Sequence, residues 1–163
     1  MENEIHGQVA SLLIGRALTV ALAESATGGS ISALLTEMAG SSRYFLGAVV
    51  AYDNAAKTRL LGVQQDTLAS HGAVSREVAL EMAEGARRAF GADVGLADTG
   101  IAGPGGGTPG KPVGLYFVAL AAAGHAEWRL QHFTGDRAAN RRQAAHAVLS
   151  MLRDFLCRLD GEA

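Results

Sequence analysis

The hydrophobic positions of the chain change their spacing several times, and each change predicts a new element. Apolar residues at helical spacing predict an amphipathic helix over residues 4–16. The short apolar run at 18–23 predicts a strand that ends in the polar, glycine-bearing segment ESATGGS, and helical spacing returns between Ile31 and Met38. The chain therefore opens with a helix, followed by a strand, a loop and a second helix.

The same reasoning predicts four more strands and three more helices. The strands are expected at 45–52, 93–98, 113–121 and 127–133. The helices are expected after the candidate N-caps Asp53 or Asn54, Ser75 and Asp136. The last two strands should pair in antiparallel fashion, because the link near Gly124 is too short for a crossover.

This alternation of strands and helices predicts an α/β fold, in which helices cover both faces of one sheet. We expect a three-layer α/β/α sandwich with a mixed, mainly parallel sheet. The 163 residues show no linker, tandem repeat or low-complexity segment, so residues 1–163 are expected to form a single domain.

Composition narrows the classes of function. The net charge of -2 leaves no overall basic field to hold a polyanion, which disfavours a dedicated nucleic-acid-binding protein. No apolar stretch approaches the ~20 residues that a membrane span needs, and the start MENEIHGQVA lacks the pattern of a signal peptide. We therefore expect a cytoplasmic protein that binds neither nucleic acid nor membranes. A small α/β domain with an exposed amphipathic helix also favours a homo-oligomer, with a dimer as the first expectation.

The single cysteine and the five histidines point away from thiol and metal chemistry. Cys157 lies in the apolar terminal helix and is expected to be buried as a small hydrophobic residue. The histidines show no metal-ligand spacing, and no cluster of Asp or Glu joins them, so no metal is expected.

Polar and glycine-rich segments follow the first three predicted strands, at residues 24–29, 52–57 and 99–112. In open α/β sheets, ligands bind outside the carboxyl ends of the strands, where loops and helix amino termini surround them. These three segments are therefore the candidate site.

Ser25 lies in the first of these segments, at a turn from strand to helix. The backbone N–H groups that follow it would be free donors at the amino end of a helix, able to form an oxyanion hole. Gly28 and Gly29 would let a carbonyl or phosphate approach closely. Taken alone, such a serine is more often a helix N-cap than a nucleophile, and both interpretations stay open here.

A nucleophilic serine needs a base, and no histidine lies in any of the three segments. Lys57 is available instead, because a lysine desolvated at the base of a cleft can lose its proton near neutral pH and accept one from serine. Tyr52 can relay or donate a proton from the same crevice. By residue type alone, a solvated helix lysine is the more common case.

The third segment matches two phosphate-binding motifs, but its context rejects both. Residues 105–111 match G-x-x-x-x-G-K, and residues 105–110 match G-x-G-x-x-G. Either phosphate loop must open a helix, whereas KPVGLYFVAL continues as a strand, and Pro112 stands where a magnesium-binding hydroxyl is needed. What remains is a glycine-rich segment whose backbone amides can hold a phosphate or cover a ligand.

Two arginines open the last predicted helix. Arg137 and Arg141 are four residues apart, so they share a helix face and can clamp one anion. A cation at a helix amino end opposes the helix dipole unless an anion or an acidic partner is present. Pairing with Asp136 or with a surface glutamate is the alternative.

Six local motifs in order carry a resemblance that covers essentially the whole chain. They are ESATGG, GSSRYFLGAVVAYDNAAK, LGV, HGAVS, TGIAGPGGGTPGKPVG and FTGDRAANR. In these motifs the sequence resembles the CinA carboxyl-terminal domain, the nicotinamide-nucleotide amidase family, in its stand-alone form. The resemblance implies hydrolysis of the carboxamide of nicotinamide mononucleotide to nicotinate mononucleotide and ammonia, without a cofactor, as part of pyridine-nucleotide salvage.

The resemblance also implies roles for individual residues. By motif position, the serine of ESATGG is Ser25, and the tyrosine and lysine of YDNAAK are Tyr52 and Lys57, which together form the expected catalytic trio. Residues of the polar segments and of the last helix are expected to contact the nucleotide, with two arginines at its phosphate. They are Thr27, Gly28, Gly29, Asn54, Thr99, Gly100, Gly103, Arg137 and Arg141.

Three departures from the family pattern concern the site. Ala26 stands where many relatives carry cysteine, so the chemistry needs no thiol at that position. Asp98 stands where relatives usually have a small or apolar residue, and Gly105 with Pro109 and Gly110 replaces a more acidic stretch. Contacts to the substrate in this loop are therefore expected to differ from those of relatives.

The alternative function is a non-catalytic nucleotide-binding or regulatory module related to competence or DNA-damage responses. A decayed enzyme would have no chemical reason to keep Ser25, Tyr52 and Lys57 together, so their joint presence favours the enzyme.

Overall fold

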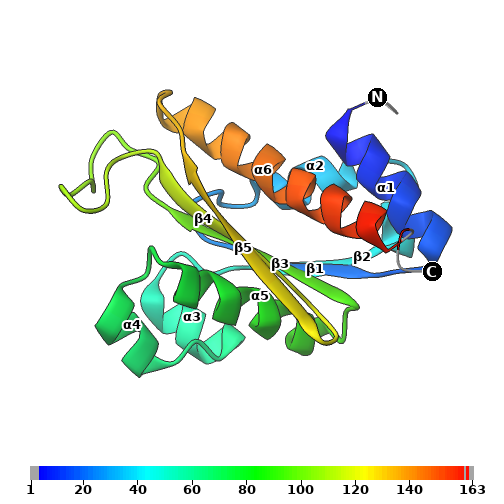
Figure 1. Cartoon of the computed structure of the whole chain (residues 1–163), viewed down its shortest axis with the longest axis horizontal. Coiled ribbons are helices and arrows are strands. Elements are labelled where there is room, and N and C mark those ends of the chain that lie inside the picture. The colour runs from blue at the N-terminus through cyan, green and yellow to red at the C-terminus, as the bar shows by residue number, and fades with distance from the viewer. Residues whose placement is uncertain (1–3, 160, 162–163) are drawn as a thin grey trace.

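Three layers of secondary structure pack together in the computed structural model, which describes residues 4–159 and 161. One face of the sheet is covered by α1 (Ile5–Arg16), α2 (Ser30–Thr36) and α6 (Arg137–Arg158). On the other side lie α3 (Asn54–Leu61), α4 (Gln65–His71) and α5 (Arg76–Phe90), as Figure 1 shows. The predicted three-layer α/β sandwich is confirmed. Residues 1–3, 160 and 162–163 of the predicted domain lie outside the described residues.

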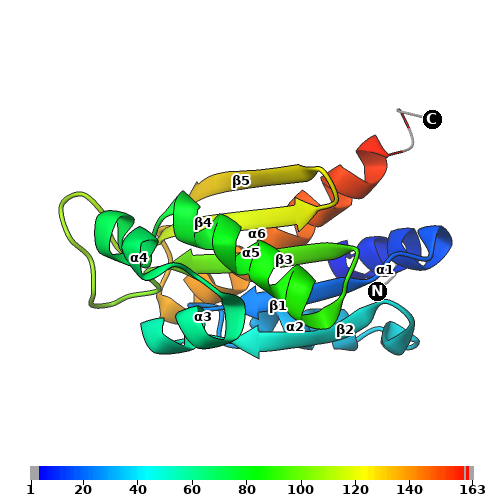
Figure 2. The same ribbon diagram turned by 90° about the horizontal axis from the view of Figure 1, so that it is seen from below.

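The sheet has the strand order β2-β1-β3-β4-β5, which can be followed in Figure 2. Its strands are β1 (Val20–Glu24), β2 (Phe45–Val50), β3 (Val94–Gly100), β4 (Leu115–Ala122) and β5 (His125–His132). β1 pairs in parallel with β2 and β3, whereas β4 is antiparallel to both β3 and β5. Four strands therefore run in one direction and β4 runs against them, which confirms the mixed, mainly parallel sheet. Because β2 and β3 flank β1, the chain changes sides at β1, and ligands favour the carboxyl ends of strands at such a point.

β1 is buried along its whole length, because helices cover both of its faces. Val20 and Leu22 pack into the core under α1 and α6. Ala21 and Ala23 pack into the second core, under α5. A strand buried on both faces shows an apolar run rather than alternation, which is why this strand could be recognised in the sequence.

The predicted helix starts are confirmed by their caps. The side chains of Asp53, Ser75 and Asp136 each accept a backbone N–H of the helix that follows. Helix α4 was not predicted. None of its residues is buried, so the sequence carries no apolar stripe to indicate it.

Cys157 is exposed, and the expectation that it would be buried is wrong. The buried face of α6 in its last turns is made by residues such as Leu152, Phe155 and Leu156. Cys157 follows Leu156 by one position, and a step of one residue turns the side chain about 100° away from that face.

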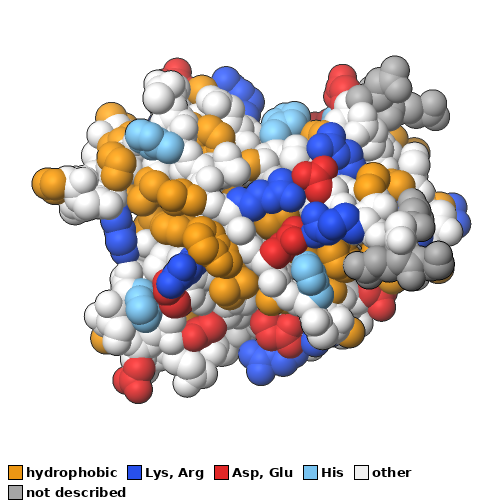
Figure 3. Space-filling view, in the orientation of Figure 1, with side chains coloured by type: hydrophobic (Ala, Val, Ile, Leu, Met, Phe, Trp, Pro, Cys, Tyr) orange, Lys and Arg blue, Asp and Glu red, His pale blue; other side chains and the backbone are white. Residues whose placement is uncertain are grey.

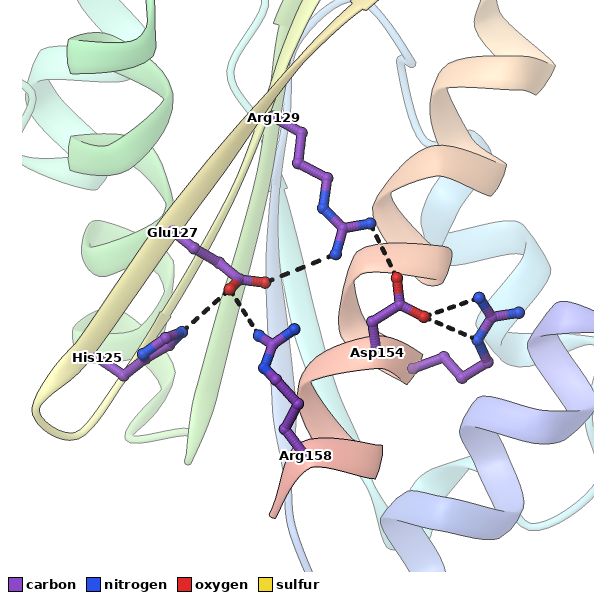
Figure 4. A network of polar contacts seen from close by, with 6 residues as sticks. His125, Glu127, Arg129, Asp154 and Arg158 are labelled. Atoms are coloured by element: carbon purple, nitrogen blue, oxygen red, sulfur yellow. Dashed lines mark hydrogen bonds and ion pairs between the residues drawn. The ribbon is translucent and has the colours of Figure 1, made fainter. Parts of the chain in front are cut away.

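Ion pairs fasten β5 to the far end of α6 (Figure 4). Glu127 on β5 pairs with Arg158 at 2.6 Å and lies 3.2 Å from His125, and Arg129 pairs with Asp154 at 3.0 Å. Such partly exposed pairs are each worth little in stability, but together they fix the register of the helix on the strand. The other end of α6, which starts with Arg137, is thereby held over the carboxyl ends of β1 and β3.

Exposed apolar side chains lie at both edges of the sheet. Leu46 and Val50 are exposed on β2, and Trp128 and Leu130 are exposed on β5, where Figure 3 shows hydrophobic side chains gathered on the surface. Oligomers commonly bury surfaces of this kind, and the dimer remains a prediction. Among the helices of the described residues, none has both the length and the hydropathy of a membrane-spanning segment.

Candidate active site

The three polar segments meet at the carboxyl ends of β1, β2 and β3, as predicted, and line one pocket of about 270 Å³. This volume is near the lower end of the range for small-molecule sites. The pocket brings together eight of the predicted site residues: Ser25, Tyr52, Asn54, Lys57, Thr99, Gly100, Gly103 and Arg137. The other four, Thr27, Gly28, Gly29 and Arg141, lie outside its lining.

A larger hollow of about 720 Å³ lies between the exposed face of α5 and the hairpin of β4 and β5. Three of its charged side chains, Glu81, Glu84 and Arg87, already have partners within the protein. Glu84 pairs with Arg87 at 2.8 Å, and Glu81 accepts the N–H of Gln64 and the hydroxyl of Thr67. The smaller pocket is the stronger candidate because it gathers the three predicted polar segments at the carboxyl ends of the strands.

The Ser25 side chain lines the pocket and is 8% exposed. Its hydroxyl makes no hydrogen bond to any described residue. The N-cap of α2 is Gly29, in a left-handed conformation with φ +99°, so Ser25 is not the helix cap. The serine is therefore free of the structural role that its position in the sequence most often indicates.

The backbone amides after Ser25 are not the open set of donors that the sequence predicted. The amide of Thr27 donates to Asp98, that of Gly28 to the carbonyl of Ser25, and that of Gly29 to Glu24. Within this turn, the amide of Ala26 is the donor that has no acceptor among the described residues. An oxyanion site can therefore use the Ala26 N–H, and the rest of the turn serves to hold it in place.

Glu24 organises the start of α2, a role that the sequence analysis missed. Its fully buried carboxylate accepts the backbone N–H groups of Gly29, Ile31 and Ser32, with distances of 2.8 to 3.1 Å. A carboxylate at a helix amino end satisfies the free donors there and complements the helix dipole. The signal in the sequence was an acidic residue placed between a buried strand and a helix.

Asp98 lies beneath the same turn and is also fully buried. It accepts the N–H of Ser25 at 3.0 Å and the N–H of Thr27 at 3.1 Å, and it contacts the Thr27 hydroxyl. Burial raises the pKa of Asp98 to about 6, although the hydrogen bonds from Thr27 and Ser25 lower it, and the nearby Glu24 raises it further. The sequence had marked Asp98 only as a departure from the family pattern.

Lys57 is 2% exposed and reaches the pocket from the first turn of α3. Its Nζ donates to the carbonyl oxygens of Ala51 at 2.9 Å and Tyr52 at 3.2 Å. Burial lowers the pKa of Lys57, and the negative charges of Asp98 and Asp53 oppose this shift. A neutral amine keeps two N–H groups for these two carbonyls and retains a lone pair, so Lys57 has the attributes of a base.

Tyr52 stands at the rim of the pocket and is 60% exposed. Its hydroxyl oxygen accepts a hydrogen bond from Arg137 at 2.9 Å, which leaves the phenol proton available for donation. Arg137 also donates to the carbonyl of Gly103 at 2.9 Å, so one guanidinium ties the second and third polar segments together.

Arg141 does not share an anion site with Arg137. It donates to the carbonyl of Thr27 at 2.9 Å and lies close to Gly28, where a Cβ would come within 3.2 Å of the guanidinium. Gly28 has φ +59°, a backbone conformation that favours glycine. The close approach that Gly28 permits is therefore that of Arg141, which fastens the turn rather than facing the pocket.

The glycine-rich segment leads into β4 and opens no helix, so the rejection of the two phosphate-loop motifs is confirmed. Gly105 and Gly106 line the pocket. The backbone amides of residues 105–107 have no acceptor within the described part of the chain. Lys111 anchors the segment by donating to the carbonyl of His71 at 2.6 Å. Free amides in succession are suited to hold an anion.

The described residues show no cluster of side chains suited to bind a metal ion. Across residues 4–159 and 161, no three His, Cys, Asp or Glu side chains are grouped as ligands of an ion. The polar side chains of the pocket are two hydroxyls, an amide, an amine, a phenol and a guanidinium, which suit acid–base chemistry and anion binding.

Comparison with known sequences finds relatives in one family. The sequence profile of the CinA C-terminal domain matches residues 2–156. CinA-like proteins from Mycobacterium sp. (strain JLS) and Syntrophotalea carbinolica are 53% identical over 153 residues and 48% identical over 158 residues. These alignments cover 93% and 97% of this chain, but 36% and 38% of the relatives. The chain thus spans little more than a third of the length of these curated relatives.

Solved structures with the same fold align with this chain over nearly the whole length of both. A competence-damaged protein (CinA) superfamily protein from Klebsiella pneumoniae superposes with a TM-score of 0.91 at 36% identity, covering 94% of this chain and 96% of its own. The competence/damage inducible protein CihA from Agrobacterium tumefaciens gives a TM-score of 0.87 at 40% identity, covering 91% and 93%.

Proposed function

Because this chain belongs to the CinA C-terminal domain family, we propose that it is a cytoplasmic amidohydrolase that converts nicotinamide mononucleotide to nicotinate mononucleotide and ammonia. The observation that carries the proposal is Lys57, a buried amine whose pKa is lowered by burial and which lines the same pocket as the uncommitted Ser25 hydroxyl. A nucleophile and a base at the carboxyl ends of neighbouring strands are the requirements of acyl transfer without histidine.

In the first half-reaction, the Ser25 Oγ attacks the carboxamide carbon while its proton passes to the neutral Lys57 Nζ. The carbonyl oxygen becomes an oxyanion, for which the Ala26 N–H is the available backbone donor. The protonated Lys57 then gives its proton to the leaving nitrogen. Ammonia departs, and the nicotinoyl group remains as an ester on Ser25.

In the second half-reaction, water attacks this ester and Lys57 takes the proton. The ester bond breaks, the Ser25 oxygen recovers the proton, and nicotinate mononucleotide leaves. Tyr52 stands at the rim with its phenol proton available, held by Arg137, and it assists as a donor to the substrate. No cofactor takes part in either step.

The phosphate of the nucleotide needs a second subsite, and Arg137 with the glycine-rich segment offers one in the same pocket. Arg137 has further N–H groups beyond those bound to Tyr52 and Gly103, and the free amides of residues 105–107 follow Gly103 along the chain. A dianionic group bound here would also satisfy the helix dipole at the start of α6, which Arg137 opposes.

The proposal is tested by measuring ammonia released by the purified protein from nicotinamide mononucleotide, nicotinamide riboside and nicotinamide. We expect the mononucleotide to give the highest kcat/KM, because it alone fills the phosphate subsite. Tight binding of the nucleotide without any ammonia release would instead support the regulatory module.

Replacing Arg137 with glutamine tests the phosphate subsite. We expect the KM for nicotinamide mononucleotide to rise about tenfold, because one charge-assisted contact to phosphate is lost. The KM for nicotinamide riboside, which lacks phosphate, should change by less than about twofold. Arg142→Gln is the matched control, because the exposed Arg142 does not line the pocket. An equal rise in KM for both substrates would place the phosphate elsewhere.

A further inference from the structure

A buried carboxylate lies beneath the Ser25 turn without lining the pocket. Asp98 comes from β3, and its two oxygens receive the backbone N–H groups of Ser25 and Thr27, the residues on either side of Ala26. One carboxylate therefore restrains three consecutive residues, and the middle one carries the free amide.

We propose that Asp98 is a positioning residue, whose carboxylate holds the Ser25 hydroxyl and the Ala26 amide toward the pocket. The functional meaning of this role rests on the proposed amidase reaction. The role itself concerns the shape of the turn and can be measured without substrate.

The geometry favours this role over simple filling of the core. Fully burying a carboxylate is unfavourable unless its hydrogen bonds are satisfied, and the groups that satisfy Asp98 come from the turn that carries the nucleophile. A comparable contact, of an aspartate with backbone and hydroxyl donors, lies at the opposite end of β1 and β3. There Asp93 accepts the N–H and the hydroxyl of Thr19, both at 2.7 Å, far from the pocket.

The charge of Asp98 also acts on the base. Titratable groups face it from each neighbouring element: Glu24 on β1, Lys57 on α3 and Tyr116 on β4, with Arg137 and Arg141 of α6 acting on Tyr116. The negative charge of Asp98 raises the pKa of Lys57 and so opposes the lowering by burial. Neutralising Asp98 should therefore lower the pKa of Lys57 further.

The variant that tests the proposal is Asp98→Asn. Asparagine keeps the shape of the side chain but carries no charge and has one acceptor oxygen in place of two, so it cannot hold both amides as the carboxylate does. Asp93→Asn is the matched control, because it makes the same change on the same strand pair away from the site.

The first readout is amide hydrogen exchange, which needs no activity. In Asp98→Asn we expect the amide of Ser25, of Thr27 or of both to exchange about tenfold faster or more than in the wild type, because asparagine keeps one acceptor oxygen for these two N–H groups. In Asp93→Asn these two amides should exchange as in the wild type.

The second readout is the titration of Lys57, which is simple to follow because the sequence contains few lysines. The chain contains two lysines, Lys57 and Lys111, so selective isotope labelling gives two signals, and Lys57→Arg assigns them. The Lys57 signal should titrate at a lower pH in Asp98→Asn than in the wild type.

With nicotinamide mononucleotide, kcat should fall about 10-fold to 100-fold while KM changes by less than about threefold.

Unchanged exchange of Ser25 and Thr27 in Asp98→Asn would overturn the proposal, and so would an equal effect of Asp93→Asn on them. If the wild type releases no ammonia, the amidase function fails, but the exchange and titration data still decide the role of Asp98. If Asp98→Asn does not fold, the wild type is used. Protection of the two amides should then fall as the pH is lowered through about 6, where Asp98 gains a proton, and constant protection from about pH 7.5 to about pH 5 would refute the role.

Discussion

Ser25→Ala is expected to lower the kcat for ammonia release from nicotinamide mononucleotide by roughly 10⁴-fold or more, as the loss of a nucleophile does in acyl transfer. The Ser25 hydroxyl bonds to no described residue, so its removal leaves no buried partner unsatisfied and the fold should be unchanged. Thermal unfolding checks the fold, and a fixed-time ammonia assay checks the activity.

Ser150→Ala is the matched control, because Ser150 lies on α6 outside the pocket. It should keep kcat within about twofold of the wild type, as a surface change away from the chemistry does. Trapping of a nicotinoyl ester on the wild type, and its absence in Ser25→Ala, would identify the attacking oxygen directly. If Ser25→Ala keeps more than a tenth of the wild-type kcat, a different nucleophile, such as water, carries the reaction.

Lys57→Met is expected to lower kcat by roughly 10³-fold to 10⁴-fold, because methionine keeps the unbranched apolar stem but has no amine to take the serine proton. The carbonyls of Ala51 and Tyr52 lose their Nζ donor in this variant, so some stability is lost as well. Unfolding curves are therefore needed to show that the protein assayed is folded.

Lys57→Arg separates the base from a fixed positive charge. Guanidinium keeps the charge and several donors but cannot lose a proton in a protein, so a lysine that acts as base is not replaced by it. The wild-type rate should rise with pH as Lys57 loses its proton, at a pH below the ordinary range of lysine because burial lowers its pKa. Substantial activity of Lys57→Arg would contradict the base and assign Lys57 an electrostatic role.

An element of the fold could be predicted from the sequence where its buried side chains follow a regular spacing. Strand β1 could be predicted from its apolar run, because helices cover both of its faces. Helix α6 could be predicted from its long apolar stripe, because it packs one face on the core. Helix α4 escaped prediction because it buries none of its side chains. The strand order also lay beyond the sequence, because pairing partners come from distant segments.

The sequence predicted which segments meet at the pocket, but not the hydrogen bonds that hold them there. Ser25, Tyr52 and Lys57 follow strands whose ends meet, and that much follows from parallel pairing. The amides of the turn donate to Glu24 and Asp98, two side chains from different strands. Asp98 is more than seventy residues away from Ser25 in the sequence, so local patterns do not predict this contact. The separate targets of Arg137 and Arg141 likewise depend on how α6 crosses the loops.

The contact between Arg141 and the carbonyl of Thr27 joins residues 114 positions apart in the chain. During synthesis, the segment around Ser25 leaves the ribosome long before α6 does, and it cannot gain this restraint until the final helix has emerged and docked. The candidate pocket is thus among the last parts of the molecule to reach its final structure. A nascent chain halted before residue 141 would lack this restraint, and it would also lack most of the helix that covers one face of the sheet.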